Sequence, residues 1–380
     1  MKKPIYLDYA AATPIDDKVF AAMKPYFKNA FYNASANYMA AKEVRSAIEQ
    51  ARKTIAGYLG SKSNEIVFTA GGTEANNLAI KGIMESFPES NVVVSAIEHE
   101  SVLEPAKRYK YKLAKVHQDG IIDLENLKKL IDDNTVLVSV IYANNEIGTI
   151  EPLTKISELI SEIRKSRKAL KNTLPIYLHT DACQAANYLS LQVSRLGIDL
   201  MTINAGKIYG PKQCGALYVN REVKLMPQIV GGGQEFGIRS GTENVANIIG
   251  FAEALKITQE AREGGSSKMQ KLQAHFLNEL NQKFPKSKIN GSIRSRLPNN
   301  VSIVFPDIDN ETLLIKLDEN RVQCSAGSAC NANKDSISHT LLAIGLSDKD
   351  AMSTLRFSMG RGTSKEDINN VIELLTAITN

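Results

Sequence analysis

The chain of 380 residues has few cysteines, no long apolar run and no strong excess of one charge. Its four cysteines form no CxxC pair and have no histidine at zinc-finger spacing, which argues against a disulfide framework and a metal site. The longest apolar stretches, such as residues 136–143, are far shorter than the roughly 18 residues that a membrane span needs. The sequence therefore predicts neither a membrane protein nor a disulfide-rich secreted one, and a reducing cytoplasm fits it best.

Charge is also nearly balanced along the chain. The 46 basic and 41 acidic residues leave a net charge of +5, and no block of five or six like charges occurs. This pattern does not favour a nucleic acid or a membrane surface as a partner. The N-terminal MKKPIYLDYAAATP places Asp8 within what would have to be an apolar signal core, so no export is expected.

Short apolar runs alternate with helical patterns over the first two thirds of the chain. Runs rich in β-branched residues predict buried strands at 65–69, 91–95, 135–143, 175–181 and 198–204. Helical spacing of apolar residues predicts a helix over 43–59, before the first of those strands, and another over 155–168, between two of them. This alternation is typical of an α/β fold with a mostly parallel, doubly wound sheet.

The pattern changes in the last third of the chain. A long polar helix is expected over 253–284, interrupted at Gly264 and Gly265, followed by strands near 300–305 and 354–358 and a last helix that starts with a capping box. We expect a large domain over residues 15–260, and a smaller α+β domain made of 1–14 and 261–380.

Lys207 follows the strand at 198–204 in the stretch NAGKIYGPK. One interpretation is a surface turn, in which glycines supply backbone freedom and the lysine lies in water. The other is an amine held inward by the bend, used as a nucleophile that forms a Schiff base with an aldehyde cofactor. The stretch alone does not decide between them.

Two further strand ends carry residues that suit such a cofactor. Gly72 and Thr73 open a helix after the strand at 65–69, where free N–H groups and the helix dipole favour a phosphate, although plain helix capping is the commoner reading. Asp181 ends the strand at 175–181 and by itself is most simply a helix cap. A buried carboxylate opposite a pyridine nitrogen would instead keep that ring protonated. Together the three strand ends suggest a pyridoxal phosphate site.

Eight ordered blocks of the sequence resemble the cysteine desulfurases, which are pyridoxal 5'-phosphate enzymes of the class V aminotransferase group within fold type I. The blocks are GGTEANNLAIKG, EHESV, NNEIG, HTDACQ, KIYGPK, GGGQEFGIRSGTEN, SAGSAC and LRFSMGR. The form SAGSAC resembles the long-loop group of this family. The resemblance extends from IYLDYAAATP near the N-terminus to TLRFSMGRGTSKEDI near the C-terminus.

The resemblance implies roles for residues in these blocks. Lys207 would bind the cofactor covalently, Asp181 would contact the pyridinium nitrogen and His99, a further catalytic residue, would stack on the ring. Gln184 and Asn145 would lie in the region of the ring hydroxyl, and Gly72 and Thr73 would bind the phosphate. Thr242 would donate a hydroxyl from the neighbouring subunit of a homodimer. Asn33 and Arg356 would bind the substrate. Arg356 would take the substrate carboxylate through its bidentate fork. On residue type alone, His99 and Gln184 could be satisfied core polar groups, and Arg356 half of a structural ion pair.

Cys330 lies in CSAGSACNANKDS, a small and polar stretch that predicts a mobile loop. Such a loop would carry the nucleophilic thiolate of the family to the substrate sulfur, leaving alanine and a persulfide on Cys330. The remaining cysteines, Cys183, Cys214 and Cys324, are assigned to packing.

The chain departs from the family pattern at the phosphate end. Gly206 stands where histidine is common, and Asn204 stands where a hydroxyl residue is common. Asn204 would still donate a side-chain N–H to the phosphate, so we expect weaker cofactor affinity rather than lost chemistry.

The resemblance thus implies a cytoplasmic, homodimeric enzyme that converts L-cysteine to L-alanine. Sulfur would pass to an acceptor protein, either an iron-sulfur scaffold or a tRNA thiolation enzyme, with no direct contact to nucleic acid or membrane and no metal. One alternative is another pyridoxal phosphate lyase or transaminase of the same fold, such as a selenocysteine lyase. A second is a non-catalytic homologue with an altered phosphate site.

Overall fold

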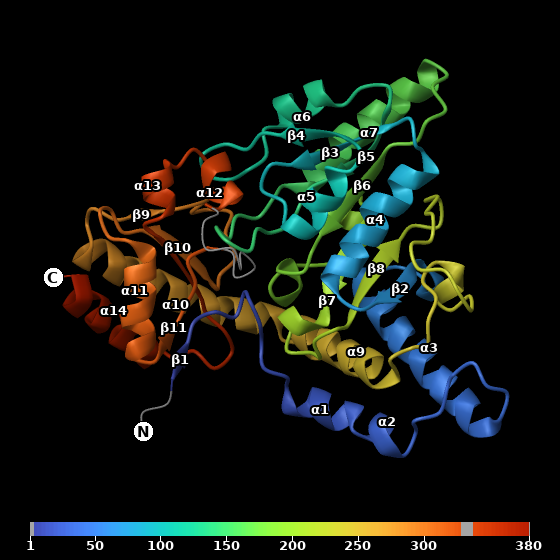
Figure 1. Ribbon diagram of the computed structural model, residues 1–380, viewed down its shortest axis with the longest axis horizontal. Coiled ribbons are helices and arrows are strands. Elements are labelled where there is room, and N and C mark those ends of the chain that lie inside the picture. Colours follow the sequence, from blue (N-terminus) through green and yellow to red (C-terminus); the bar gives the residue numbers. More distant parts are fainter. Residues whose placement is uncertain (1–3, 328–336, 380) are drawn as a thin grey trace.

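The computed structural model describes residues 4–327 and 337–379, and the structural statements below concern these residues. Figure 1 shows two parts side by side, a larger one built on a wide sheet and a smaller one formed mainly by the C-terminal segments in orange and red.

A seven-stranded sheet forms the centre of the larger part. Its strands are β2 (Ile66–Thr69), β3 (Asn91–Ser95), β4 (Lys110–Ala114), β5 (Thr135–Ser139), β6 (Tyr177–Asp181), β7 (Leu200–Asn204) and β8 (Gly215–Val219). The spatial order is β2-β8-β7-β6-β5-β3-β4, and all neighbours are parallel except that β8 is antiparallel to both β2 and β7. The prediction of a mostly parallel α/β sheet is therefore confirmed.

Helices cover both faces of this sheet, because alternate strand residues point to opposite sides. Val93 of β3 belongs to the cluster that packs against α3 (Met39–Leu59), α7 (Leu153–Ala169) and α9 (Val245–Glu260). Val92 and Val94 belong to the cluster that packs against α4 (Gly72–Ser86) and α5 (Glu100–Ala106). Apart from the edge strand β4, which is mostly exposed, the strands are buried along nearly their whole length, as their continuous apolar runs predict.

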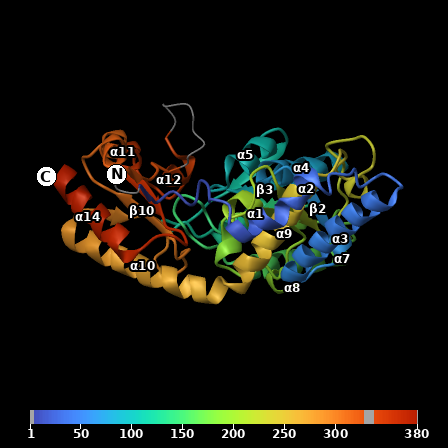
Figure 2. The same cartoon turned by 90° about the horizontal axis from the view of Figure 1, so that it is seen from below.

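The smaller part has its own apolar core. It contains the antiparallel sheet β12-β10-β9, the parallel pair β1-β11 and the helices packed on them. The elements are β1 (Ile5–Tyr6), α10 (Arg262–Lys283), β9 (Lys288–Ile289), β10 (Asn300–Val304), α11 (Asn310–Glu319), β11 (Val322–Gln323), α12 (His339–Ala343), α13 (Asp348–Ala351), β12 (Thr354–Ser358) and α14 (Lys365–Thr379). Figure 2 shows α10 extending under this part beside α14. Leu7 belongs to this core, so the N-terminal segment packs with the C-terminal part of the chain. The domain boundaries after residues 14 and 260 stay a prediction.

The remaining helices lie on the larger part. They are α1 (Asp17–Met23), α2 (Pro25–Lys28), α6 (Leu124–Leu130) and α8 (Val193–Leu196). Both α1 and α2 pack against α9. None of the helices in the described parts of the chain is long and apolar enough to cross a membrane.

Some predicted boundaries are wrong by a few residues. The long helix breaks at Ala261, between α9 and α10, while Gly264 and Gly265 continue inside α10. Helix geometry tolerates two exposed glycines at a modest cost when neighbouring turns are packed. The strand expected to reach residue 143 ends at Ser139. The capping box is confirmed, because Ser364 Oγ accepts a hydrogen bond from Asp367 N and Ser364 N donates to the Asp367 carboxylate.

Candidate active site

A cavity of about 190 Å³ opens at the carboxyl edge of the sheet, between the two parts of the molecule. Ligands of open α/β sheets bind at this edge. Of the residues that the sequence singles out, the cavity brings together Gly72, Thr73, His99, Asn145, Asp181, Gln184, Asn204, Lys207 and Arg356. These side chains come from segments that are far apart in the chain, so the fold alone makes them neighbours.

Lys207 lies on a single turn of 3-10 helix directly after β7. The side chain of Asn204 accepts a hydrogen bond from Gly206 N at 3.1 Å, which starts this turn. The amine of Lys207 donates to the carbonyl oxygens of Ala10 and Ala11 at 2.9 and 2.6 Å. The bend therefore turns the lysine toward the cavity and the N-terminal segment, rather than into open water.

Asp181 ends β6 with a side chain that is only 5% exposed. Its carboxylate accepts hydrogen bonds from Asn76 Nδ2 at 2.7 Å and from Cys183 N at 2.9 Å. Two donors stabilise its charged form. Burial and the charge of Asp181 raise the pKa of the Cys183 thiol well above its usual range, which disfavours its thiolate.

Two buried titratable groups beside Asp181 have pKa values shifted in the direction that favours their neutral forms. Burial and, second, the charge of Asp181 raise the pKa of the Glu98 carboxyl well above its usual range. Burial lowers the pKa of His179 to about 4. Asp181 itself accepts hydrogen bonds from two donors, Asn76 Nδ2 and Cys183 N.

His99 caps α5 and lines the cavity. Its Nδ1 accepts a hydrogen bond from Ser101 N at 3.0 Å, so the neutral ring carries its proton on Nε2. Ser101 Oγ also contacts Nδ1 at 2.8 Å and accepts a hydrogen bond from Asn76. One chain of polar contacts therefore joins His99 to Asp181 through Ser101 and Asn76.

The other end of the cavity is formed by the start of α4. A side chain at Gly72 would place its Cβ 2.9 Å from Cys183 Sγ, so only glycine leaves this space open. An adjoining hollow is lined by Gly71, Gly72, Asn204, Gly206 and Lys212 among others. Free N–H groups, the positive end of a 15-residue helix and a lysine suit a phosphate group.

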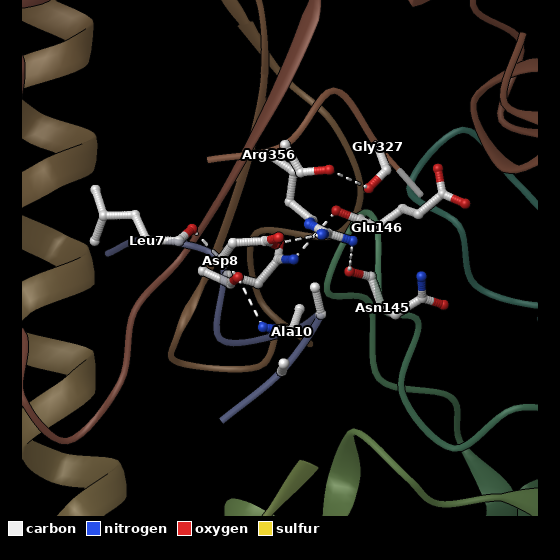
Figure 3. A network of polar contacts seen from close by, with 12 residues as sticks. Leu7, Asp8, Ala10, Asn145, Glu146, Gly327 and Arg356 are labelled. Carbon is white, nitrogen blue, oxygen red and sulfur yellow. Dashed lines mark hydrogen bonds and ion pairs between the residues drawn. The ribbon is translucent and has the colours of Figure 1, made fainter. Parts of the chain in front are cut away.

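Arg356, on β12, is 1% exposed and reaches the cavity from the smaller part. Its Nη2 forms an ion pair with Asp8 at 2.6 Å, and Nη1 donates to the carbonyl oxygen of Asn145 at 3.2 Å (Figure 3). Within the described residues, buried Nε has no hydrogen-bond partner. An unsatisfied buried N–H is costly, and a ligand carboxylate would satisfy it.

Gln184 reaches the cavity but donates its Nε2 to the carbonyl oxygen of Ala10 at 2.9 Å. Thr242 lies elsewhere, in a hollow with Thr69 and Arg239, and Asn33 is exposed and accepts a hydrogen bond from Ser35 N. Cys330 lies outside the described residues. The roles expected for these residues stay predictions.

The sequence reasoning missed Asp8 and Asn76, which hold Arg356 and Asp181 in place. Asp8 lies in IYLDYAAATP and Asn76 in GGTEANNLAIKG, two stretches that resemble the cysteine desulfurases. Their place in these stretches is the only feature of the sequence that indicated a role in the site.

The donor set fits pyridoxal 5'-phosphate. The cavity offers an amine for an aldehyde at Lys207, an anionic partner for a ring nitrogen at Asp181 and a side-chain-free helix start for a phosphate at Gly72. No group of three His, Cys, Asp or Glu side chains in the described ranges could hold a metal ion.

Comparisons with known proteins agree with this donor set. The family model of class-V aminotransferases matches residues 5–371. The chain is 39% identical to cysteine desulfurase IscS of Dictyoglomus turgidum, an alignment that covers 100% of this chain and 95% of the relative. It is 38% identical to cysteine desulfurase IscS 1 of Archaeoglobus fulgidus, with 98% and 96% of the two chains covered.

Solved structures give the same picture. A NifS-like protein superimposes with a TM-score of 0.90 at 30% identity, and the match covers 99% of both chains. A structure of SspA in complex with cysteine superimposes with a TM-score of 0.80 at 33% identity, over 93% of this chain and 98% of that one.

Proposed function

The chain belongs to the class-V aminotransferases and, within them, to the cysteine desulfurases, a pyridoxal 5'-phosphate-dependent family, and we propose that it binds this cofactor and converts L-cysteine to L-alanine. The observation that carries the proposal is the convergence of Lys207, Asp181 and Arg356 on one cavity. These three groups offer an amine, a carboxylate and a guanidinium to a single bound molecule.

The residues of the larger part would hold the cofactor. Lys207 would bind it covalently, Asp181 would accept a hydrogen bond from the ring nitrogen and His99 would lie on the ring. Gly72, Thr73 and Asn204 would donate N–H and O–H groups to the phosphate, and Gln184 and Asn145 would lie near the ring hydroxyl. When bound, the cofactor supplies an electron sink that makes the Cα–H bond of the substrate acidic.

Lys207 and Arg356 would handle the substrate. The amine of Lys207 would take the Cα proton, because the carbonyl oxygens of Ala10 and Ala11 hold it at the cavity wall. Arg356 would bind the substrate carboxylate through its buried Nε, while Asp8 keeps the guanidinium in place. Asn33 would contribute to the substrate side.

Cys330 would accept the sulfur. Its thiolate attacks the substrate sulfur, an S–S bond forms as the Cβ–S bond of the substrate breaks, and the electron pair passes to the carbon skeleton, which takes up protons to become alanine. The persulfide sulfur then passes to an acceptor protein, for which an iron-sulfur scaffold and a tRNA thiolation enzyme are the two candidates.

A homodimer is part of the proposal, with Thr242 reaching the phosphate of the neighbouring subunit. Large apolar side chains are exposed on α1, on α2 and in the segments near them and near residue 230; they are Phe20, Phe27, Phe31, Tyr38, Met39, Met226, Ile229, Val230 and Phe236. Exposed apolar groups of this kind favour a protein partner, and a second copy is the one we propose. We place the enzyme in the cytoplasm, with no direct contact to nucleic acid or membrane.

The test compares the wild type with Lys207→Ala and Cys330→Ser in an assay of alanine formed from L-cysteine. Both variants should lose activity, but only Lys207→Ala should also lose the visible absorption of the bound cofactor. Equal activity in all three proteins would contradict the proposal. A transaminase or a lyase that needs no thiol would keep its activity in Cys330→Ser, and a non-catalytic homologue would show no cofactor absorption at all.

A further inference from the structure

The hollow at the start of α4 contains an acid where the phosphate would bind. It is lined by residues 71–73 and by the next residue of the helix, Glu74. Among the described residues that line this hollow, Glu74 is the only acid, and Lys207 and Lys212 are the cations. A carboxylate beside a bound phosphate repels it, because both groups are negatively charged. A phosphate therefore binds well here only if the charge of Glu74 is neutralised.

Arg239 provides the opposite charge. Its Nε lies 2.8 Å from Glu74 Oε1, and its Nη2 donates to Glu74 Oε2 at 3.3 Å. Both side chains are 22% exposed, so water screens the ion pair only in part. An arginine that contacts both oxygens fixes the direction of a carboxylate as well as balancing its charge.

Glu74 also bonds to the loop before the helix. Its Oε2 accepts a hydrogen bond from Ala70 N at 3.0 Å. Glu74 is the third residue of α4, the position from which a glutamate commonly reaches back to an N–H near the helix start. Ala75 N is bonded to the carbonyl oxygen of Gly71, and the helical N–H groups before it are those that a helix start leaves for an outside acceptor. The carboxylate thus takes a loop N–H and leaves the helix start to a ligand.

We propose that Arg239 is a positioning residue for the cofactor phosphate. Its ion pair removes a repulsive charge from the hollow and keeps the Glu74 carboxylate turned toward Ala70 N. The N–H groups at the start of α4 then face the phosphate without a competing acid. The inference rests on the proposed function, since it takes the phosphate of pyridoxal 5'-phosphate as the ligand.

The segment 231–244, which contains Arg239, has a second anchor. Glu235 accepts hydrogen bonds from Arg52 Nη2 and from Phe68 N, each at 2.8 Å. The side chains of Arg52 and Glu235 are 4% and 3% exposed, so this anchor is buried. Substitution of Arg239 should therefore leave the protein folded and the segment in place.

The experiment titrates the cofactor-free full chain with pyridoxal 5'-phosphate and, separately, with pyridoxal, and follows the visible absorption of the bound ligand. Arg239→Gln leaves the charge of Glu74 unbalanced, so the affinity for pyridoxal 5'-phosphate should fall about fivefold or more. Pyridoxal carries no phosphate, and its affinity should change by less than about twofold. The loss should shrink as salt is added, because both side chains are partly exposed.

Glu74→Gln separates the effect of charge from that of tethering. It breaks the same ion pair but removes the acid, so the affinity for pyridoxal 5'-phosphate should stay equal or rise. The double variant Glu74→Gln/Arg239→Gln should bind within about twofold of the wild type, because neither charge remains. Arg164→Gln is the matched control, since it also takes one positive charge from an ion pair, with Asp199, and lines neither this hollow nor that of Arg239. Both of its affinities should equal those of the wild type.

Three results would overturn the inference. A loss of affinity in both Glu74→Gln and Arg239→Gln would make the ion pair a tether of the segment 231–244. An equal loss for pyridoxal and its phosphate in Arg239→Gln would place the effect away from the phosphate, and an unchanged affinity would remove the role of Arg239. Failure of the proposed function looks different, because the wild type itself would then bind no pyridoxal 5'-phosphate, and the inference would fall with it.

Discussion

The two ends of the cavity are built in opposite ways. Around Asp181 the side chains of Asn76 and Ser101 are buried and bonded to one another, and Ser101 connects them to half-buried His99. Around Gly72 the adjoining hollow is lined by glycines at positions 71, 72 and 206, and Lys212 beside them is exposed. The protein thus fixes the side chains at the end of the cavity that would contact the cofactor ring. It leaves the end that would bind the phosphate open to water.

The difference follows from what each end must do. A carboxylate that acts on a ring nitrogen has to remain charged out of water, so it needs donors with fixed directions. A phosphate carries its charge with it, and backbone N–H groups at a helix start can bind it without a long side chain. Gly206 and Asn204, the two residues that depart from the family pattern, therefore lie at the phosphate end of the cavity, which tolerates such changes.

The largest expected effect comes from breaking the buried end with Asp181→Asn. Asn76 Nδ2 and Cys183 N both donate to this side chain, so the new amide nitrogen would face a donor, and the ring would lose its anionic partner. We expect alanine formation to fall about 100-fold or more. A cofactor titration should show a smaller loss of affinity.

Asp199→Asn is the matched control, because Asp199 pairs with Arg164 at 2.5 Å and does not line the cavity. It should lower the free energy of unfolding without changing the rate per bound cofactor. Equal rates for Asp181→Asn and the wild type would contradict the prediction.

A second change at the same end, Glu98→Gln, should alter the pH dependence of stability. Burial raises the pKa of Glu98 from 4.5 in the folded protein, so its contribution is fully present below that pH and is lost as pH rises toward the folded pKa. Each pH unit removes at most about 1.4 kcal/mol. Glutamine carries no such charge and can still accept from Ile141 N.

Urea denaturation of the wild type and of Glu98→Gln between pH 5 and 8 tests this sign. The wild type should lose stability relative to the variant as pH rises. Parallel curves would show that Glu98 gains no proton on folding.

The smallest expected effect comes from strengthening the open end with Gly206→His. A Cβ at this position would lie 3.6 Å from Lys212 Cγ, which is ordinary contact, so the backbone here accepts a side chain. One added hydrogen bond to a phosphate should raise the affinity for pyridoxal 5'-phosphate about threefold to tenfold. Pyridoxal without the phosphate is the control ligand and should bind as before; an equal gain for both ligands would place the effect elsewhere.

Much of the fold could be predicted from the sequence. The strands at Asn91–Ser95 and Leu200–Asn204 are continuous apolar runs, and burial on both faces leaves them few alternatives. The helix break was placed at Gly264 and Gly265 but lies at Ala261, because the packing of α9 and α10 on different cores sets where the chain bends. Local propensity contains no information on that packing.

The candidate site was predictable in its residues but not in its contacts. Lys207 and Asp181 stand at strand ends, where the sheet itself brings them together. Asp8 was not recognised, since its partner Arg356 lies at the other end of the chain and only the folded molecule joins them. Thr242, Asn33 and Cys330 stay predictions.

The N-terminal segment has a consequence for the order in which the protein assembles. Residues 5 and 6 pair with residues 322 and 323, Asp8 reaches Arg356, and Ala10 and Ala11 hold the amine of Lys207. A ribosome therefore releases this segment long before any of its β-sheet or ion-pair partners exist. Because these contacts join the two ends of the chain, the candidate pocket becomes complete only after synthesis of nearly the whole polypeptide.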